Sequence, residues 1–395
     1  MSSRARLFPL QVPVSNAVLT KTRMRVLISV APSIGHIIPL FDVGRALRDA
    51  GHEVRVATHE SRHGLVAAAG LEPVAAGISS DEMVAERLRR WPETAQQPAT
   101  TWAVRMWVGI MAPAALSGLR SIMDSWSPDL VLHDEGEYGA PVAAAAAGIP
   151  WATHGFGSPL RPVHELFELE ELARPVWAAV GQPMPANAGL YTHALINPCP
   201  PMLQSNAPGA AVVWPLRPRP FEGDGAVVEA DAYVGFGTVP TFADAPAELE
   251  AAVRACAALG MRVVVTARTP ELREQLVAID PRHVVAEQFV SLPVLLRTCK
   301  VVITHAGAGT VLASLAAGVP LVLVPRGSPS QVRMGAACQD AGIGRCCDTA
   351  GIAKALEVVL TDPAYAAAAR HAADQIASMP SAVQVVRQIE ELTNG

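Results

Sequence analysis

One short segment combines glycines, a histidine and the start of a helix, the residue types that hold a phosphate. It follows the apolar run Val301–Thr304 and precedes the helix-forming run Val311–Ala317. The segment consists of His305, Ala306, Gly307, Ala308, Gly309 and Thr310. A small-residue turn before a helix presents backbone N–H groups and the positive end of the helix dipole to an anion. Glycines are equally typical of an ordinary tight turn between a strand and a helix, so this interpretation depends on the rest of the chain.

A second candidate site pairs a histidine with a carboxylate. His36 ends the turn Ala31–His36 after the apolar strand Met24–Val30, and Asp134 ends the apolar strand Leu130–Asp134. A neutral imidazole can take a proton from a hydroxyl, and a carboxylate on its other nitrogen would orient it. The alternatives are a capping or solvated histidine and an aspartate that caps a turn. His133 and Glu135 compete with Asp134 for the orienting role.

Length and composition limit the class of protein. A chain of 395 residues exceeds one core, which predicts two domains of roughly 150–200 residues each. Hydrophobic residues make up 50% and charged residues 17%, as in soluble α/β proteins. The net charge of −5 and the absence of a basic stripe argue against nucleic-acid binding by a broad basic face.

The chain also lacks recognisable signals for membranes, metals and disulfides. We find no apolar stretch of about 18 residues and no signal sequence, which predicts a cytoplasmic protein without a membrane-spanning helix. The six cysteines form no Cys-x-x-Cys pair, so we expect reduced thiols. No Asp-x-Asp pair is present to hold a divalent metal ion.

The fold class follows from alternating strands and helices. Strands are predicted at Met24–Val30 and Glu53–Thr58 with the helix Ile38–Ala50 between them, a βαβ unit of a parallel sheet. The pattern continues through Leu130–Asp134, helix Pro141–Ala147 and strand Ile149–Thr153, and restarts with Ala232–Gly235, helix Ala247–Leu259, strand Arg262–Thr266, helix Leu292–Thr298, strand Val301–Thr304 and strand Val319–Pro325. We therefore predict two doubly wound, Rossmann-like α/β domains facing a central cleft.

Composition shifts mark the predicted domain boundaries. Residues 1–23 are expected to form a disordered extension and 24–205 the first domain. The proline-rich stretch 206–230 is the predicted linker, and 231–378 the second domain. We expect the last segment, 379–395, to be a helix that packs back on the first domain.

In this order, the motifs resemble those of the GT-B glycosyltransferases. Specifically, they are similar to the metal-independent plant and bacterial natural-product enzymes that use nucleotide sugars, including antibiotic, enediyne and macrolide glycosyltransferases. The resemblance runs from Met24 to the C-terminus. It rests on Asp134, the segment 305–310 and these further motifs: Gly35-His36-x-x-Pro39, Pro198-Cys199-Pro200-Pro201, Phe236-Gly237-Thr238, Gly318-Val319-Pro320 and Pro325 to Gln331.

The resemblance implies how a nucleotide-sugar donor is bound. His305, Gly307, Gly309 and Thr310 would hold the diphosphate, together with Thr238. Phe289 would stack on the nucleobase and the backbone of Val290 would pair with it, although Ser291 and Leu292 replace the Pro and Gln of the family. Ser330-Gln331 stands where the family usually has Asp-Gln to bind sugar hydroxyls. Because serine lacks the charged acceptor, we expect a deoxygenated or otherwise modified sugar on thymidine diphosphate.

The resemblance also implies the reaction. His36 would deprotonate an acceptor hydroxyl with Asp134 as its orienting carboxylate, and direct displacement would invert the anomeric centre. Backbone N–H groups and His305 would stabilise the leaving diphosphate without a metal or other cofactor. The predicted acceptor pocket, suited to a hydrophobic aglycone, is lined by Trp102, Met106, Trp107, Met111 and Phe156. The alternative for these residues is simple helix packing.

Three other functions fit the sequence less well. A dehydrogenase would need a Gly-x-Gly-x-x-Gly turn after the first strand, and Ala31–His36 lacks it. A sugar-nucleotide epimerase of the same fold would need further acidic catalytic residues. A catalytically silent helper of a partner transferase would not need both His36 and His305. We expect small-molecule partners only, with no nucleic acid or membrane, and leave a homodimer open.

Overall fold

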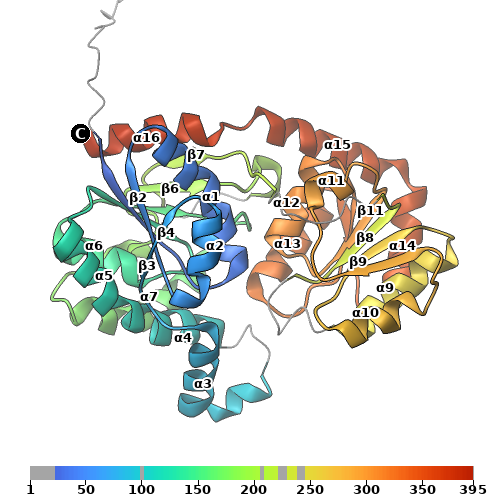
Figure 1. The fold of residues 1–395 in the computed structure, drawn as a ribbon, viewed down its shortest axis with the longest axis horizontal. Helices are drawn as coiled ribbons and strands as arrows, with labels where there is room; N and C mark the ends of the chain where they lie inside the picture. Colours follow the sequence, from blue (N-terminus) through green and yellow to red (C-terminus); the bar gives the residue numbers. More distant parts are fainter. Residues whose placement is uncertain (1–22, 98–101, 205–208, 221–228, 238–244, 395) are drawn as a thin grey trace, which may run out of the picture.

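The computed structural model describes residues 23–97, 102–204, 209–220, 229–237 and 245–394. It shows two α/β units side by side (Figure 1), each built on a parallel sheet with helices on both faces. This is the predicted class of two doubly wound domains. The expected extension, residues 1–23, lies outside the described residues except for Arg23.

The first sheet places the predicted base and carboxylate strands next to each other. Its strand order is β3-β2-β1-β4-β5-β6-β7, and every pairing is parallel. The strands are β1 (Arg25–Ser29), β2 (Glu53–Thr58), β3 (Glu72–Ala75), β4 (Leu130–Asp134), β5 (Trp151–His154), β6 (Ala194–Asn197) and β7 (Val213–Pro215). Because β1 pairs with β4, the carboxyl ends of both strands meet at one edge of the sheet.

Helices cover both faces of this sheet, and an excursion between β3 and β4 extends below it (Figure 1). The helices are α1 (Ile34–Asp49), α2 (His63–Ala68), α3 (Ser80–Arg90), α4 (Ala103–Met106), α5 (Ala112–Trp126), α6 (Gly139–Ala147) and α7 (Val163–Ala178). A π-helical turn, Trp107–Met111, joins α4 to α5. By length and composition alone, the helical stretch Ala103–Trp126 is apolar enough to cross a membrane. In this fold Leu119 and Met123 of this stretch lie in the core, and α5 packs against α6.

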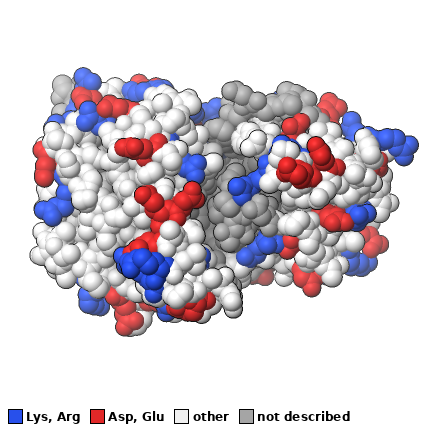
Figure 2. All heavy atoms as spheres, turned by 60° about the horizontal axis from the view of Figure 1, so that its bottom comes forward, with Lys and Arg blue, Asp and Glu red and all other residues white. Residues whose placement is uncertain are grey.

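The second unit repeats the plan with strand order β10-β9-β8-β11-β12-β13. Its strands are β8 (Ala232–Gly235), β9 (Val263–Thr266), β10 (Val284–Glu287), β11 (Val301–Thr304), β12 (Leu321–Leu323) and β13 (Gly344–Cys346). Its helices are α9 (Pro246–Ala258), α10 (Pro270–Val277), α11 (Leu292–Leu295), α12 (Ala308–Ala316), α13 (Pro329–Asp340), α14 (Ile352–Thr361) and α15 (Pro363–Ser378). Charges of both signs are interspersed over the face shown in Figure 2.

The last helix returns to the first unit. α16 (Ala382–Asn394) follows the break at Met379-Pro380 and runs along α1 (Figure 1). Val385 and Ile389 are completely buried in the same cluster as Val26 and Ile28 of β1. The break is held by Arg217, whose backbone N–H donates to the Pro380 carbonyl at 2.7 Å.

Three features differ from the sequence predictions. The predicted linker, 206–230, is wrong in part, because Val213–Pro215 forms β7 at the edge of the first sheet. His36 lies in the first turn of α1, which begins at Ile34 rather than Ile38. Likewise, α12 begins at Ala308, so the turn after β11 is shorter than predicted. Both helix starts were missed because residues of low helix propensity lie inside them: Gly35 and Pro39 in α1, and Gly309 in α12.

We predict that α16 is part of the first unit's core. Val385→Ala removes a fully buried side chain and should lower the free energy of unfolding by about 1–3 kcal/mol, seen as a drop of several degrees in Tm by calorimetry. Val383 lies on the same helix with 62% of its surface exposed. Val383→Ala should leave Tm within about one degree, and equal losses for the two variants would contradict this packing.

Candidate active site

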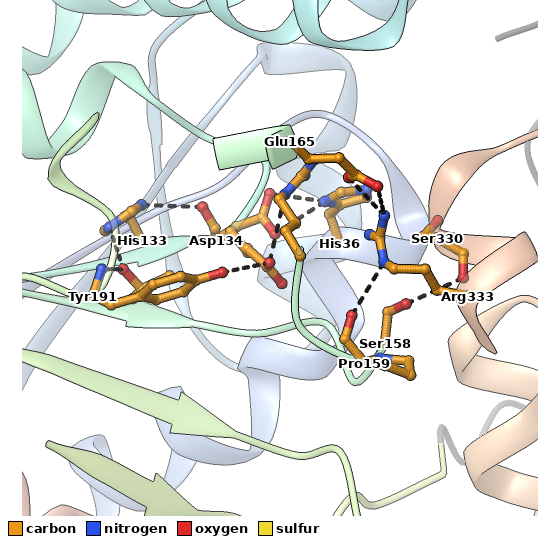
Figure 3. A network of polar contacts seen from close by, with 12 residues as sticks. His36, His133, Asp134, Ser158, Pro159, Glu165, Tyr191, Ser330 and Arg333 are labelled. Carbon is orange, nitrogen blue, oxygen red and sulfur yellow. Dashed lines mark hydrogen bonds and ion pairs between the residues drawn. The ribbon is translucent and has the colours of Figure 1, made fainter. Parts of the chain in front are cut away.

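His36 and Asp134 lie in direct contact at the carboxyl edge of the first sheet (Figure 3). His36 Nδ1 is 2.9 Å from Asp134 Oδ1 and 2.8 Å from Oδ2. The Asp134 side chain is completely buried, and that of His36 is 18% exposed. With the carboxylate on Nδ1, the proton of the neutral ring is held there and Nε2 is left as the basic atom.

Gly136 makes this close approach possible. A Cβ at position 136 would lie 2.8 Å from His36 Cε1 and 3.1 Å from Asp134 Oδ2. The Gly136 N–H also hydrogen-bonds to the Asp134 carboxylate. A side chain at this position would therefore displace the imidazole from its carboxylate.

Contact between His36 and Asp134 shifts the pKa of each side chain. Burial lowers the pKa of His36, but the charge and hydrogen bond of Asp134 outweigh it and raise the pKa above its ordinary 6.5. Burial raises the pKa of Asp134, and the opposing charge and hydrogen bond of His36 bring it below its usual value. Asp134 is thus an anion at neutral pH, and His36 titrates above pH 6.5.

The neighbours of Asp134 are engaged elsewhere, so the carboxylate that contacts His36 is Asp134. His133 is buried and donates from Nδ1 to the Glu137 carbonyl at 2.9 Å, while its Nε2 accepts from Thr153 Oγ1 at 2.9 Å. Burial lowers the pKa of His133 to about 4. Glu135 Oε1 accepts the hydroxyl of Tyr191 at 2.7 Å.

A second buried acid supports the end of this sheet. Glu137 accepts bonds from the backbone N–H groups of Gly139 at 2.8 Å and Ala140 at 2.9 Å, at the start of α6. Its other bond comes from Ser29 Oγ at 3.0 Å. Burial raises the pKa of Glu137 to about 7. This acid ties the ends of β1 and β4 together.

Two of the five predicted acceptor residues flank His36. The rings of Trp107 and Phe156 each have their centroid 5.0 Å from that of His36. Trp107 begins the π-helical turn, a local widening of the helix that is frequent at functional sites. Trp102, Met106 and Met111 lie in a buried cluster that includes Ile110, and Trp107 packs against it. Burial in this cluster is what simple helix packing predicts for these three residues.

The predicted phosphate segment lies at the carboxyl end of β11. Gly307 precedes the first residue of α12, and Ala306 adopts a left-handed backbone with φ +65°. The His305 ring is enclosed by two glycines: a Cβ on Gly237 would lie 2.7 Å, and one on Gly307 2.5 Å, from His305 Cε1. Burial, with the charge of Arg326, lowers the pKa of His305 to about 4. The imidazole is therefore neutral at neutral pH.

The remaining predicted donor residues surround this segment in sequence but differ in accessibility. Phe289 is 43% exposed, whereas Val290 is buried. Ser330 Oγ lies 2.9 Å from Ser328 Oγ, and Gln331 Oε1 accepts the backbone N–H of Arg326 at 2.9 Å. Ser330 and Gln331 belong to the first turn of α13. Thr238 lies outside the described residues.

Sequence reasoning missed several residues that complete the site. The prediction gives no role to Gly136, Glu137, Tyr191 or Arg161. Arg161 forms an ion pair with Glu135 beside the site, with Nε 3.7 Å from Oε1. The run His133–Glu137 offered a signal, because four of its five residues are titratable and it directly follows the apolar residues Leu130–Leu132. Tyr191 and Arg161 carry no such local signal.

Two family models match the sequence. Residues 45–231 match the erythromycin biosynthesis protein CIII-like N-terminal domain, and residues 250–392 match the corresponding C-terminal domain. The chain belongs to this family of glycosyltransferases. Its fold is therefore GT-B, and the members it resembles are natural-product enzymes of antibiotic biosynthesis.

Relatives of this glycosyltransferase family match along nearly the whole chain. The elloramycin glycosyltransferase of Streptomyces olivaceus is 28% identical over 389 residues, 93% of this chain and 97% of its own. The glycosyltransferase SnogD of Streptomyces nogalater has a TM-score of 0.73 at 25% identity, covering 94% and 99% of the two chains. Spinosyn rhamnosyltransferase complexed with thymidine diphosphate has a TM-score of 0.74 at 26% identity, covering 93% and 100%.

The described part of this glycosyltransferase contains no group of three or more His, Cys, Asp or Glu side chains that could hold a metal ion. All six cysteines are described and are free thiols. Burial raises the pKa of Cys256, Cys299 and Cys338 to about 12. These three thiols are protonated at neutral pH, as expected of packing residues.

The contact between His36 and Asp134 predicts a titration that needs no substrate. By NMR, the His36 ring should titrate above pH 6.5, while His133, His154 and His305 stay neutral down to about pH 4. Asp134→Asn removes the charge and leaves burial, so the pKa of His36 should fall below 6.5. Asp124→Asn, at an exposed position on α5, is the control and should leave the His36 titration unchanged.

Proposed function

We propose that this protein transfers a sugar from a thymidine-diphosphate donor to a hydroxyl of a hydrophobic natural-product aglycone, with inversion and without a metal ion. The sugar in this proposal is a deoxygenated or amino sugar. The observation that carries the proposal is the buried His36–Asp134 pair beside Trp107 and Phe156.

His36 acts as the general base in this reaction. Asp134 holds the proton on Nδ1, so Nε2 takes the proton of the acceptor hydroxyl as its oxygen attacks the anomeric carbon. The buried carboxylate then stabilises the imidazolium that forms. A single displacement of this kind inverts the anomeric centre, because the nucleophile enters opposite the leaving diphosphate.

The second unit stabilises the negative charge that develops on the leaving diphosphate. The backbone N–H groups at the start of α12 and the positive end of its dipole face an anion placed beyond Gly307. His305 is neutral, so it contributes an N–H donor rather than a positive charge. Such donors stabilise a leaving group because they are already oriented before the reaction.

Two further features support the identity of the substrates. Spinosyn rhamnosyltransferase, a structural relative, has been solved with thymidine diphosphate and with spinosyn aglycone. In this chain Ser330 replaces the acidic residue expected for glucose, and its hydroxyl already lies within hydrogen-bonding distance of Ser328. This sugar-side turn thus lacks a carboxylate acceptor, which favours a sugar with fewer hydroxyls.

We predict the following turnover pattern. With one aromatic or macrolide aglycone as acceptor, thymidine-diphosphate deoxysugars should be transferred and UDP-glucose should be a poor donor, measured by liquid chromatography and mass spectrometry. His36→Ala should lower kcat by about 10²–10⁴-fold, the usual contribution of a general base. Its affinity for thymidine diphosphate should remain unchanged. A clear preference for UDP-glucose, or full activity of His36→Ala, would refute the proposal.

The glycine beside His305 offers a matched pair of substitutions. Gly307→Ala would place a methyl group 2.5 Å from His305 Cε1 and displace the ring. The displaced ring would lose its hydrogen bond to the diphosphate, and a hydrogen bond to a charged group contributes about 1.5–3 kcal/mol. Thymidine-diphosphate binding should therefore weaken by about 10- to 100-fold. A Cβ on Gly64, on α2 of the first unit, has no atom within 4 Å, so Gly64→Ala is the control. Calorimetric titration should separate the two variants, and equal affinities would remove His305 from the diphosphate site.

A further inference from the structure

An ion pair joins the two units beside the candidate active site (Figure 3). Arg333, on α13 of the second unit, donates from Nη1 to both carboxylate oxygens of Glu165 on α7, at 2.8 and 2.7 Å. Its Nε donates to the Pro159 carbonyl at 3.4 Å. A single arginine thus contacts both the start of α7 and the loop that precedes it.

A second hydrogen bond joins the same two segments. Ser158 Oγ donates to the Ser330 carbonyl at 3.2 Å. Ser330 and Arg333 are three residues apart near the start of α13, so both contacts hold the same end of this helix. Gly157 adopts a left-handed backbone with φ +90°, and a Cβ there would collide with Leu312 of α12. The loop before α7 therefore lies against both helices of the predicted donor site.

The pair is largely shielded from solvent, unlike most ion pairs among the residues that the structure describes. The side chains of Arg333 and Glu165 are 16% and 23% exposed, whereas those of Arg254 and Glu250 on α9 are 61% and 52% exposed. Exposed pairs contribute little because water and salt screen them. A shielded pair loses much more when one partner is removed, because the other charge is left without compensation.

The two ends of this contact carry different halves of the proposed site. The loop of the first unit also contains Phe156, whose ring is 5.0 Å from that of His36. The first turn of α13 in the second unit contains Ser330 and Gln331, the residues that the family resemblance places on the sugar side of the donor. The ion pair therefore connects the loop that contacts His36 to the helix that would bind the sugar.

We propose that Arg333 and Glu165 are positioning residues for glycosyl transfer. They hold the first turn of α13 against the loop before α7, so that the anomeric carbon of the donor faces the hydroxyl activated by His36. This inference rests on the proposed function. Displacement requires the reacting atoms to lie about 3–3.5 Å apart and in line, and a shift of about 1 Å lowers the rate about 10²-fold. Neither residue touches the reacting atoms in this scheme.

The test is a charge exchange across the contact. Arg333→Glu and Glu165→Arg each place like charges together and should lower kcat by about 10- to 100-fold. The double variant restores an opposite pair and should recover at least about ten-fold in kcat relative to either single variant. The affinity for thymidine diphosphate, measured by calorimetric titration, should stay within about three-fold in all variants. Arg254→Glu, which disturbs the exposed pair on α9, is the control and should keep wild-type kcat.

Two results would overturn the positioning role. One is wild-type kcat in both single variants. The other is a double variant no more active than the single ones, because a pair that acts by joining the units must be rescued by exchange. A loss of activity caused by misfolding is recognised separately, since it would also lower Tm and nucleotide affinity.

Small-angle X-ray scattering separates failure of this inference from failure of the proposed function. Breaking the contact should increase the radius of gyration of the single variants, and charge exchange should reverse the increase. One outcome is that the wild-type protein transfers no sugar while the radius of gyration still increases in the single variants and returns to normal in the double variant. In that case the contact between the units is supported and the proposed function is refuted. If scattering and kcat are both insensitive to the charges, the positioning role falls and the proposed function stands.

Discussion

The buried carboxylate of Asp134 is the constraint around which the candidate site is built. A carboxylate removed from water must be compensated by donors or by an opposite charge. Here His36 and the Gly136 N–H provide that compensation. The pairing of β1 with β4 brings the first turn of α1 to this carboxylate, and glycine at position 136 leaves room for the imidazole. The same compensation raises the pKa of His36, so one electrostatic requirement determines both geometry and basicity.

The two units divide the chemistry according to charge. The first unit gathers acids at the end of its sheet, where a carboxylate can stabilise an imidazolium. The second offers a helix N-terminus and a neutral histidine, which suit an anion. Both sites lie at the carboxyl ends of parallel strands, the edge where open α/β sheets bind ligands. This division of charge matches the proposed placement of the base in the first unit and of the leaving diphosphate in the second.

Much of this could be predicted from sequence, because the relevant signals are local. The apolar runs at β1, β4 and β11 predict buried strands. Asp134 ends its strand, and His36 and His305 lie in the segments that follow theirs. Some short strands were not predicted because they contain proline, which is unfavourable in strands. β7 is three residues long and contains Pro215, and β3 contains Pro73. Contacts between distant residues left no trace either, since 168 positions separate Arg333 from Glu165 and 56 separate Tyr191 from Glu135. Local periodicity carries no information about such pairs.

The return of α16 to the first unit has a consequence for recombining these enzymes. Val385 and Ile389 complete the core beside β1 although they are encoded at the opposite end of the chain. A chimera made by exchanging everything after the linker would replace part of the first unit's interior with foreign side chains. A cut between α15 and α16, at Met379-Pro380, would keep each interior intact. The boundary that preserves both cores therefore requires two junctions rather than one.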